Sequence, residues 1–160
     1  MGMPIGFTKA LTVSNGTAVA AVQALAGGGA VTLSSGGSIF ASQRRVVITL
    51  TASNSGNVIA VAGTNDSGTA IGENITVTAT GTSFPTTMDY KTITSISTTT
   101  LTGNISVGTN TTGSSPWQMA NPWNNPVNIA VAVSLPTAAA ATYSCEYTLD
   151  LDPCGVLNNT

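Results

Sequence analysis

Residues 114–135 read SSPWQMANPWNNPVNIAVAVSL, a proline-rich loop followed by the clearest strand pattern in the chain. The loop carries both tryptophans, Trp117 and Trp123, and three of the seven prolines. Because proline lacks an N–H and has a fixed φ, these prolines exclude a helix or a central strand over residues 116–126. Residues 127–135 then alternate large apolar with small side chains, which is the period of two expected for a strand. The stretch predicts an irregular, stiffened loop that sits on a β-sheet.

The same alternation recurs elsewhere in the chain. Residues 44–51, RRVVITLT, predict a strand with one apolar face. Residues 71–79 predict another, in which Glu73 points the same way as the apolar side chains. Residues 141–150 predict the last strand, with Cys145 on its apolar face. Counting the shorter segments between turns, we expect about nine or ten strands and no long helix. The predicted fold is an all-β antiparallel sandwich, of which the jelly roll is one form, with an extended N-terminal arm.

The length of 160 residues predicts a single domain. Within it we assign residues 1–40 to an N-terminal arm or first strands, residues 41–152 to the sandwich core and residues 153–160 to a tail. The first segment carries Phe7 and Phe40, which we consider apolar anchors for contact with another protein.

The charge content limits the possible partners. The chain has 4 basic and 6 acidic residues, whereas binding of a nucleic-acid backbone rests on several lysine or arginine contacts. No apolar run reaches the length of a membrane span. Nucleic acid and membranes are therefore not expected partners. A low charge also weakens the repulsion between copies, so we expect the chain to work in an assembly.

Residues 18–26, AVAAVQALA, imitate the apolar core and cleavage site of a signal peptide. The polar residues that precede them interrupt the pattern. We therefore expect synthesis in the cytoplasm. A bacterial surface or adhesin domain is a weaker alternative, because it would require an export signal.

The residue types exclude the common catalytic arrangements. Without histidine there is no Ser-His or Cys-His pair and no common zinc set. Two cysteines, Cys145 and Cys154, are too few for a disulfide framework, and Cys145 is expected to be a small core residue. Asp150 and Asp152 could offer oxygens to calcium, but acids at a loop end beside a proline are more often solvated. We expect no enzyme activity, no cofactor and no metal.

Two sets of residues remain as candidate sites. Glu73 lies among isoleucines, and because an unpaired buried carboxylate is costly, we expect it to form a buried ion pair with Arg44 or Arg45. Trp117 and Trp123 can plug the end of the sandwich, anchor a protein interface or stack on a sugar. The sequence leaves these three roles open.

A series of short motifs also runs through the chain. They are Arg44-Arg45, Gly63-Thr64-Asn65, Glu73, Lys91-Thr92-Ile93, Ser115-Pro116-Trp117, and Tyr143 with Tyr147-Thr148. In this order they resemble a group of small virion proteins encoded in tailed bacteriophages and prophages. The resemblance covers roughly residues 40–150, its motifs are structural, and the ending Asp150-Leu-Asp-Pro-Cys departs from it.

The resemblance implies a non-enzymatic virion component, foremost a capsid decoration or cement protein. Such a protein bridges subunits of the major coat protein at the capsid surface, and it is expected to associate with other copies of itself. An interface of standard size, about 1,600 Å² in total, would need anchors such as the four aromatic residues named above. The alternative is a carbohydrate- or receptor-binding module of a phage tail or fibre that uses Trp117 and Trp123.

Overall fold

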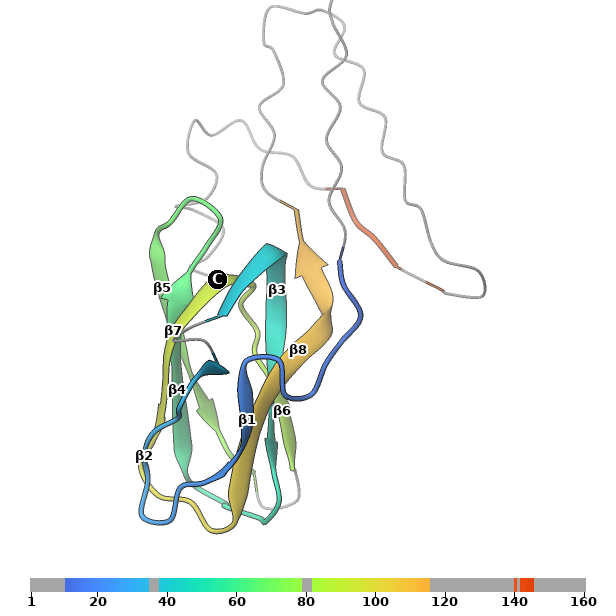
Figure 1. Ribbon diagram of the computed structural model, residues 1–160. Helices are drawn as coiled ribbons and strands as arrows, with labels where there is room; N and C mark the ends of the chain where they lie inside the picture. Colours follow the sequence, from blue (N-terminus) through green and yellow to red (C-terminus); the bar gives the residue numbers. More distant parts are fainter. Residues whose placement is uncertain (1–10, 35–37, 79–81, 116–139, 141, 146–160) are drawn as a thin grey trace, which may run out of the picture.

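The computed structural model describes residues 11–34, 38–78, 82–115, 140 and 142–145. These residues form an all-β domain without a helix, and all pairing between the named strands is antiparallel (Figure 1). The strands are β1 (Ala20–Ala24), β2 (Gly29–Ala30), β3 (Ser38–Leu50), β4 (Val58–Thr64), β5 (Ala70–Thr76), β6 (Ser83–Pro85), β7 (Tyr90–Thr98) and β8 (Asn104–Ser114). The predicted all-β antiparallel class is confirmed.

The strands pair in a nested order. β1 pairs with β8, β2 with β7, β3 with β6 and β4 with β5. Pairing of β8 with β3 and of β7 with β4 then gives two layers, β1-β8-β3-β6 and β2-β7-β4-β5. This is the strand order of a jelly roll, a long hairpin rolled into two packed sheets.

β3 joins the two layers. Its first residues pair with β7, and its later residues pair with β8 and β6. Register shifts on either side of Arg44 mark irregular pairing at this point. Because a bulge bends a strand and increases its twist, β3 can leave one layer and enter the other. The sequence pattern of residues 44–51 found only the second part of this strand.

The core lies between the two layers. Val46, Ile48 and Leu50, the predicted apolar face of β3, are at most 2% exposed. They pack in the same cluster as apolar residues of β4 and β7, such as Ile59 and Ile96. Burial of each such side chain contributes about 1.5–3 kcal/mol. The alternation that predicted the strands therefore also selected the side chains that hold the layers together.

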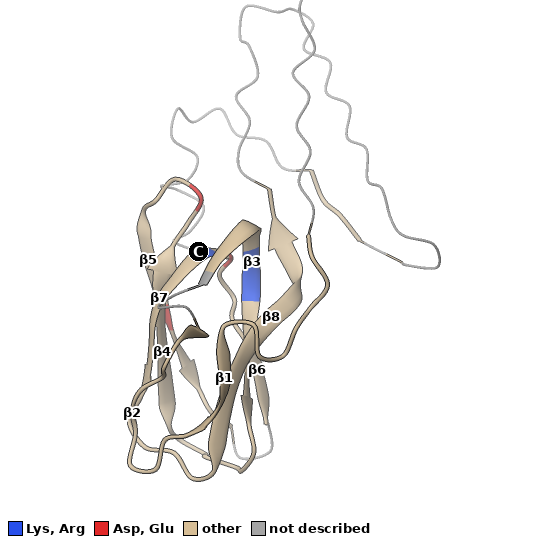
Figure 2. Cartoon of the chain, viewed as in Figure 1, with Lys and Arg blue, Asp and Glu red and all other residues tan. Residues whose placement is uncertain are grey.

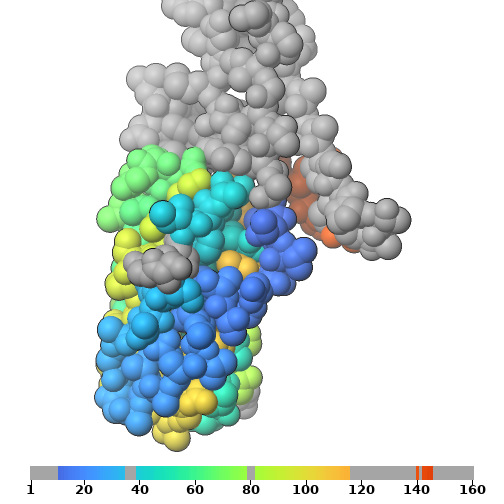
Figure 3. Space-filling view, viewed as in Figure 1, coloured from blue at the N-terminus to red at the C-terminus, as the bar shows by residue number. Residues whose placement is uncertain are grey.

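Part of residues 1–40 belongs to the packed body. β1 and β2 are strands of the two layers, and Val19 and Val31 lie in the core. Figure 3 shows these N-terminal residues, in blue, packed against the body. Residues 1–10 lie outside the described part of the chain.

The β4–β5 hairpin has a well-formed turn. Asn65, 1% exposed, accepts hydrogen bonds at Oδ1 from the N–H of Ser67 (3.1 Å) and of Thr69 (2.9 Å). Gly68 has a φ of 82°, which glycine adopts without strain. The turn begins directly after β4, which ends at Thr64.

The prediction of a last strand over residues 141–150 is wrong for the residues that the structure describes there. Residues 142–145 are not in a strand, Tyr143 is 65% exposed and Cys145 is an exposed free thiol rather than a core residue. Alternation gives a segment an apolar face, but a strand also needs a neighbouring backbone to bond. None of the described strands pairs with this segment. The predicted strand at residues 127–135 lies outside the described residues.

Candidate functional site

The charged side chains of the described residues gather in one half of the molecule. Figure 2 shows them in the upper half of the described ribbon, and the lower half carries none. They are Arg44, Arg45, Asp66, Glu73, Asp89 and Lys91. Each of them has polar partners within the chain, as described below.

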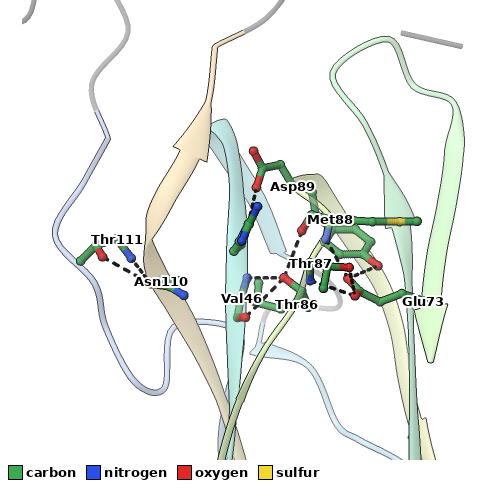
Figure 4. A network of polar contacts seen from close by, with 10 residues as sticks. Val46, Glu73, Thr86, Thr87, Met88, Asp89, Asn110 and Thr111 are labelled. Atoms are coloured by element: carbon green, nitrogen blue, oxygen red, sulfur yellow. Dashed lines mark hydrogen bonds and ion pairs between the residues drawn. The ribbon is translucent and has the colours of Figure 1, made fainter. Parts of the chain in front are cut away.

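Glu73 of β5 is bound by the segment that precedes β7 (Figure 4). Its Oε2 accepts hydrogen bonds from the N–H and the Oγ1 of Thr87, at 2.9 and 2.7 Å. Its Oε1 accepts from the N–H of Met88 and from the hydroxyl of Tyr90, both at 3.2 Å. Hydrogen bonds to a carboxylate are charge-assisted and strong, so four donors satisfy this group without a cation.

The predicted ion pair between Glu73 and Arg44 or Arg45 is therefore wrong. Among the described residues the ion pairs are Arg45 with Asp89, at 3.3 Å, and Lys91 with Asp66, at 3.2 Å. The prediction placed Glu73 on the correct face of its strand. It missed the partners because two of the four donors are backbone N–H groups, which carry no residue-type signal in a sequence, and the other two are hydroxyl groups on a separate segment.

Tyr90 completes this cluster from the core. Its side chain is fully buried, and its hydroxyl donates to Glu73. Burial, followed by the negative charge of Glu73 and the hydrogen bond to it, raises the pKa of Tyr90 well above its usual value near 10. The hydroxyl consequently remains a proton donor throughout the physiological range.

Arg44 fixes the N-terminal segment to β8. The side chain is 3% exposed and donates to Thr12 Oγ1 (2.6 Å), to the Thr12 carbonyl (3.0 Å) and to the Asn110 carbonyl. Its Nε is buried without a hydrogen-bond partner. Burial lowers the pKa of the guanidinium below its usual value. Asn15 extends the contact, since its backbone exchanges hydrogen bonds with Thr109.

A groove lies beside this contact, on the outer side of β3, β6 and β8. Its volume is about 340 Å³. It is lined by Ser14, Gly16, Val47, Ser83, Pro85, Thr109, Asn110 and Thr111. These residues offer hydroxyl, amide and backbone groups, and none of them is charged or aromatic. Such a lining can hydrogen-bond a neutral polar ligand, but it holds no nucleophile with a base beside it.

The predicted interface residues are only partly covered by the described chain. Trp117, Trp123 and Phe7 lie outside it. Phe40 is half-buried and packs against the core of its own chain, whereas its neighbour Ile39 is 79% exposed. Adjacent residues of a strand point to opposite faces, so the pair Ile39-Phe40 can present one side chain to solvent.

Three comparisons with known proteins gave no relative. No protein-family model matches the chain, and neither curated proteins nor solved structures match it. Within the described residues, no three or more histidine, cysteine, aspartate or glutamate side chains come together in a set that could hold a metal ion. The same residues contain no helix of the length and apolarity needed to cross a membrane.

Proposed function

We propose that the chain is a non-enzymatic structural protein of the virion of a tailed bacteriophage, foremost a capsid decoration or cement protein that bridges coat subunits. The observation that carries the proposal is the internal use of charge. All six charged side chains of the described residues bond to groups of the same chain. Within the described residues, what remains for contact is a surface without free charges that is rich in hydroxyl groups.

A neutral surface favours permanent assembly over charge-driven capture of ligands. Charged patches accelerate encounter and select partners by sign, and low charge removes the repulsion that keeps copies apart. The jelly roll adds two rigid layers without a catalytic arrangement in the described residues. Because jelly rolls serve in viral capsids and also in lectins, the fold is compatible with the proposal and does not select it.

The test is the copy number of the chain in purified virions, measured by mass spectrometry relative to the coat protein. On the order of hundreds of copies would support decoration, whereas about six or twelve would indicate a neck or tail component, since such parts follow low-order ring symmetry. In a second measurement, purified chain is added to capsids that lack it. Binding should change little between about 0.05 and 0.5 M salt, because exposed charges contribute little to it. Absence from virions together with no capsid binding would end the proposal.

The groove favours a second candidate, a carbohydrate- or receptor-binding module of a tail or fibre. Its hydroxyl and amide lining suits a neutral sugar, although the stacking aromatic that such sites commonly use is not among its residues. A glycan array would support this candidate if binding appeared and was lost on Asn110→Ala or Trp117→Ala. A blank array alongside capsid binding would favour decoration.

A further inference from the structure

Each layer of the sandwich ends in two edge strands, β1 and β6 in one layer and β2 and β5 in the other. An edge strand exposes unpaired backbone N–H and C=O groups to which another strand can add. Proteins block such edges with short strands, prolines, bulges, charges or a covering segment. The four edges of this domain differ sharply in this respect.

Three of the edges are protected. β2 has two residues, and β6 has three with Pro85 as the last. β1 has an irregular register between Ala20 and Gln23. The segment after β2 also contacts this strand, because the Gln23 side chain exchanges two hydrogen bonds of 2.9 Å with the backbone of Thr32.

β5 is not short, and it carries neither a proline nor a bulge. It has seven residues, and it pairs with β4 in unbroken register from Val58↔Thr76 to Thr64↔Ala70. It contains no proline, lysine or arginine, and the part of the chain that the structure describes places no strand on its far side. Figure 1 shows it at the flank of the molecule. Its single charge, Glu73, is bound by its own chain and does not guard the edge.

The hydrogen bonds at the two ends of the hairpin show which backbone groups face outward. Val77 donates to the Asn57 carbonyl at one end, and Asn65 donates to the Thr69 carbonyl at the other. Since antiparallel pairs alternate between bonded and non-bonded, the odd-numbered residues of β5 bond to β4. The N–H and C=O groups of Ala70, Gly72, Asn74 and Thr76 therefore point away from β4, and these four residues are exposed and uncharged.

We propose that β5 pairs edge to edge, antiparallel, with β5 of a second copy around a two-fold axis. Both edges are neutral, so self-pairing brings no free charges together. A register centred on Gly72 sets Glu73 opposite Ile71 of the other copy instead of opposite the second Glu73, which avoids a like-charge pair. The two β2-β7-β4-β5 layers then form one continuous sheet. The contact specifies how copies of the proposed virion protein join, and in this respect it rests on the proposed function.

The first test is amide hydrogen exchange of the wild-type chain at dilute and concentrated conditions. The N–H groups of Ala70, Gly72 and Asn74 should exchange at least about tenfold more slowly at high concentration, because they become paired in the register centred on Gly72. Amides of the odd-numbered residues are already bonded and should change much less. Two results would overturn the proposal. One is unchanged exchange at Gly72 and Asn74 in a sample that sedimentation shows to be oligomeric. The other is a chain that stays monomeric at every concentration.

The second test uses two matched variants in analytical ultracentrifugation. Asn74→Lys places a charge on the edge and should weaken self-association at least about tenfold. Ser95→Lys makes the same change in charge at an exposed position of β7, which is not an edge strand. It should change the dissociation constant of self-association by no more than about twofold. Equal effects of the two variants contradict the edge contact.

Capsid binding separates this inference from the proposed function. A chain that binds capsids but does not self-associate through β5 retains the function and loses the inference. A chain that dimerises through β5 but binds no capsid keeps the inference and loses the function.

Discussion

Removing the hydroxyl of Tyr90 should change the way in which stability depends on pH. The fully buried side chain donates to Glu73, and its pKa is raised in the folded state. Below pH 10 tyrosine is protonated in both the folded and the unfolded chain, so this contribution is fully present. Above pH 10 the unfolded chain releases the proton while the folded chain keeps it. The folded state then binds more protons, and its stability falls as pH rises towards the folded pKa.

The size of the effect follows from the linkage relation. Each pH unit above 10 costs up to about 1.4 kcal/mol, so the free energy of unfolding should fall by about 2 kcal/mol between pH 8 and 11.5 from Tyr90 alone. In Tyr90→Phe this component is absent. At pH 8 the variant should be about 1.5–3 kcal/mol less stable than the wild type, because a hydrogen bond to a charged group is lost. By pH 11.5 the gap should shrink by about 2 kcal/mol.

Urea unfolding followed by far-ultraviolet circular dichroism at pH 8 to 11.5 measures this gap. The control is Tyr143→Phe, which removes the hydroxyl of a side chain that is 65% exposed and should leave the curve of the wild type unchanged. A gap between wild type and Tyr90→Phe that stays constant over the whole range would refute the reasoning, since it would mean that Tyr90 ionises equally in the two states.

Two further changes test the polar cluster and the N-terminal contact by urea unfolding. Glu73→Gln should lower the free energy of unfolding by about 1–3 kcal/mol, because either orientation of the amide points its NH₂ at a backbone N–H. Asp89→Asn breaks only a partly exposed ion pair and should lower it by less than about 1 kcal/mol. Equal losses of stability in the two variants would argue against the cluster. Gly108→Ala should cost at least about 2 kcal/mol, because the new Cβ would lie 2.3 Å from the Asn15 carbonyl oxygen. Gly16→Ala meets no atom within 4 Å and is the matched control; a neutral Gly108→Ala would mean that the segment does not lie on β8.

The apolar alternation was enough to predict the fold class and the core side chains. Val46, Ile48 and Leu50 alternate in the sequence and are buried in the structure, because the period of two is a local property of an extended chain. The strand order could not be predicted in the same way. Pairing of β1 with β8 joins residues far apart in the sequence, and no local pattern specifies which strands meet.

In the candidate site, too, local features could be predicted from the sequence and contacts between distant segments could not. The direction of the Glu73 side chain followed from the alternation, but its donors Thr87 and Met88 act largely through the backbone and left no signal. Arg44 is buried because it donates hydrogen bonds to Thr12 and Asn110. These residues lie on two segments far from Arg44 in the sequence, so no local pattern indicated the contact. The predicted burial of Cys145 is wrong because alternation alone does not supply a pairing partner for the strand.

The nested strand order also bears on how the chain folds. Of the ladders between described strands, β4–β5 is the only one that joins consecutive strands, and every other ladder closes a longer loop. Contacts of large sequence separation slow folding, to milliseconds or seconds in all-β domains. We expect the turn from Asn65 to Gly68 to form first and the outer ladders to close in sequence around it. The strand edge that we propose for self-association would then be in place before the rest of the domain, so newly made chains could begin to associate while β1 and β8 are still apart.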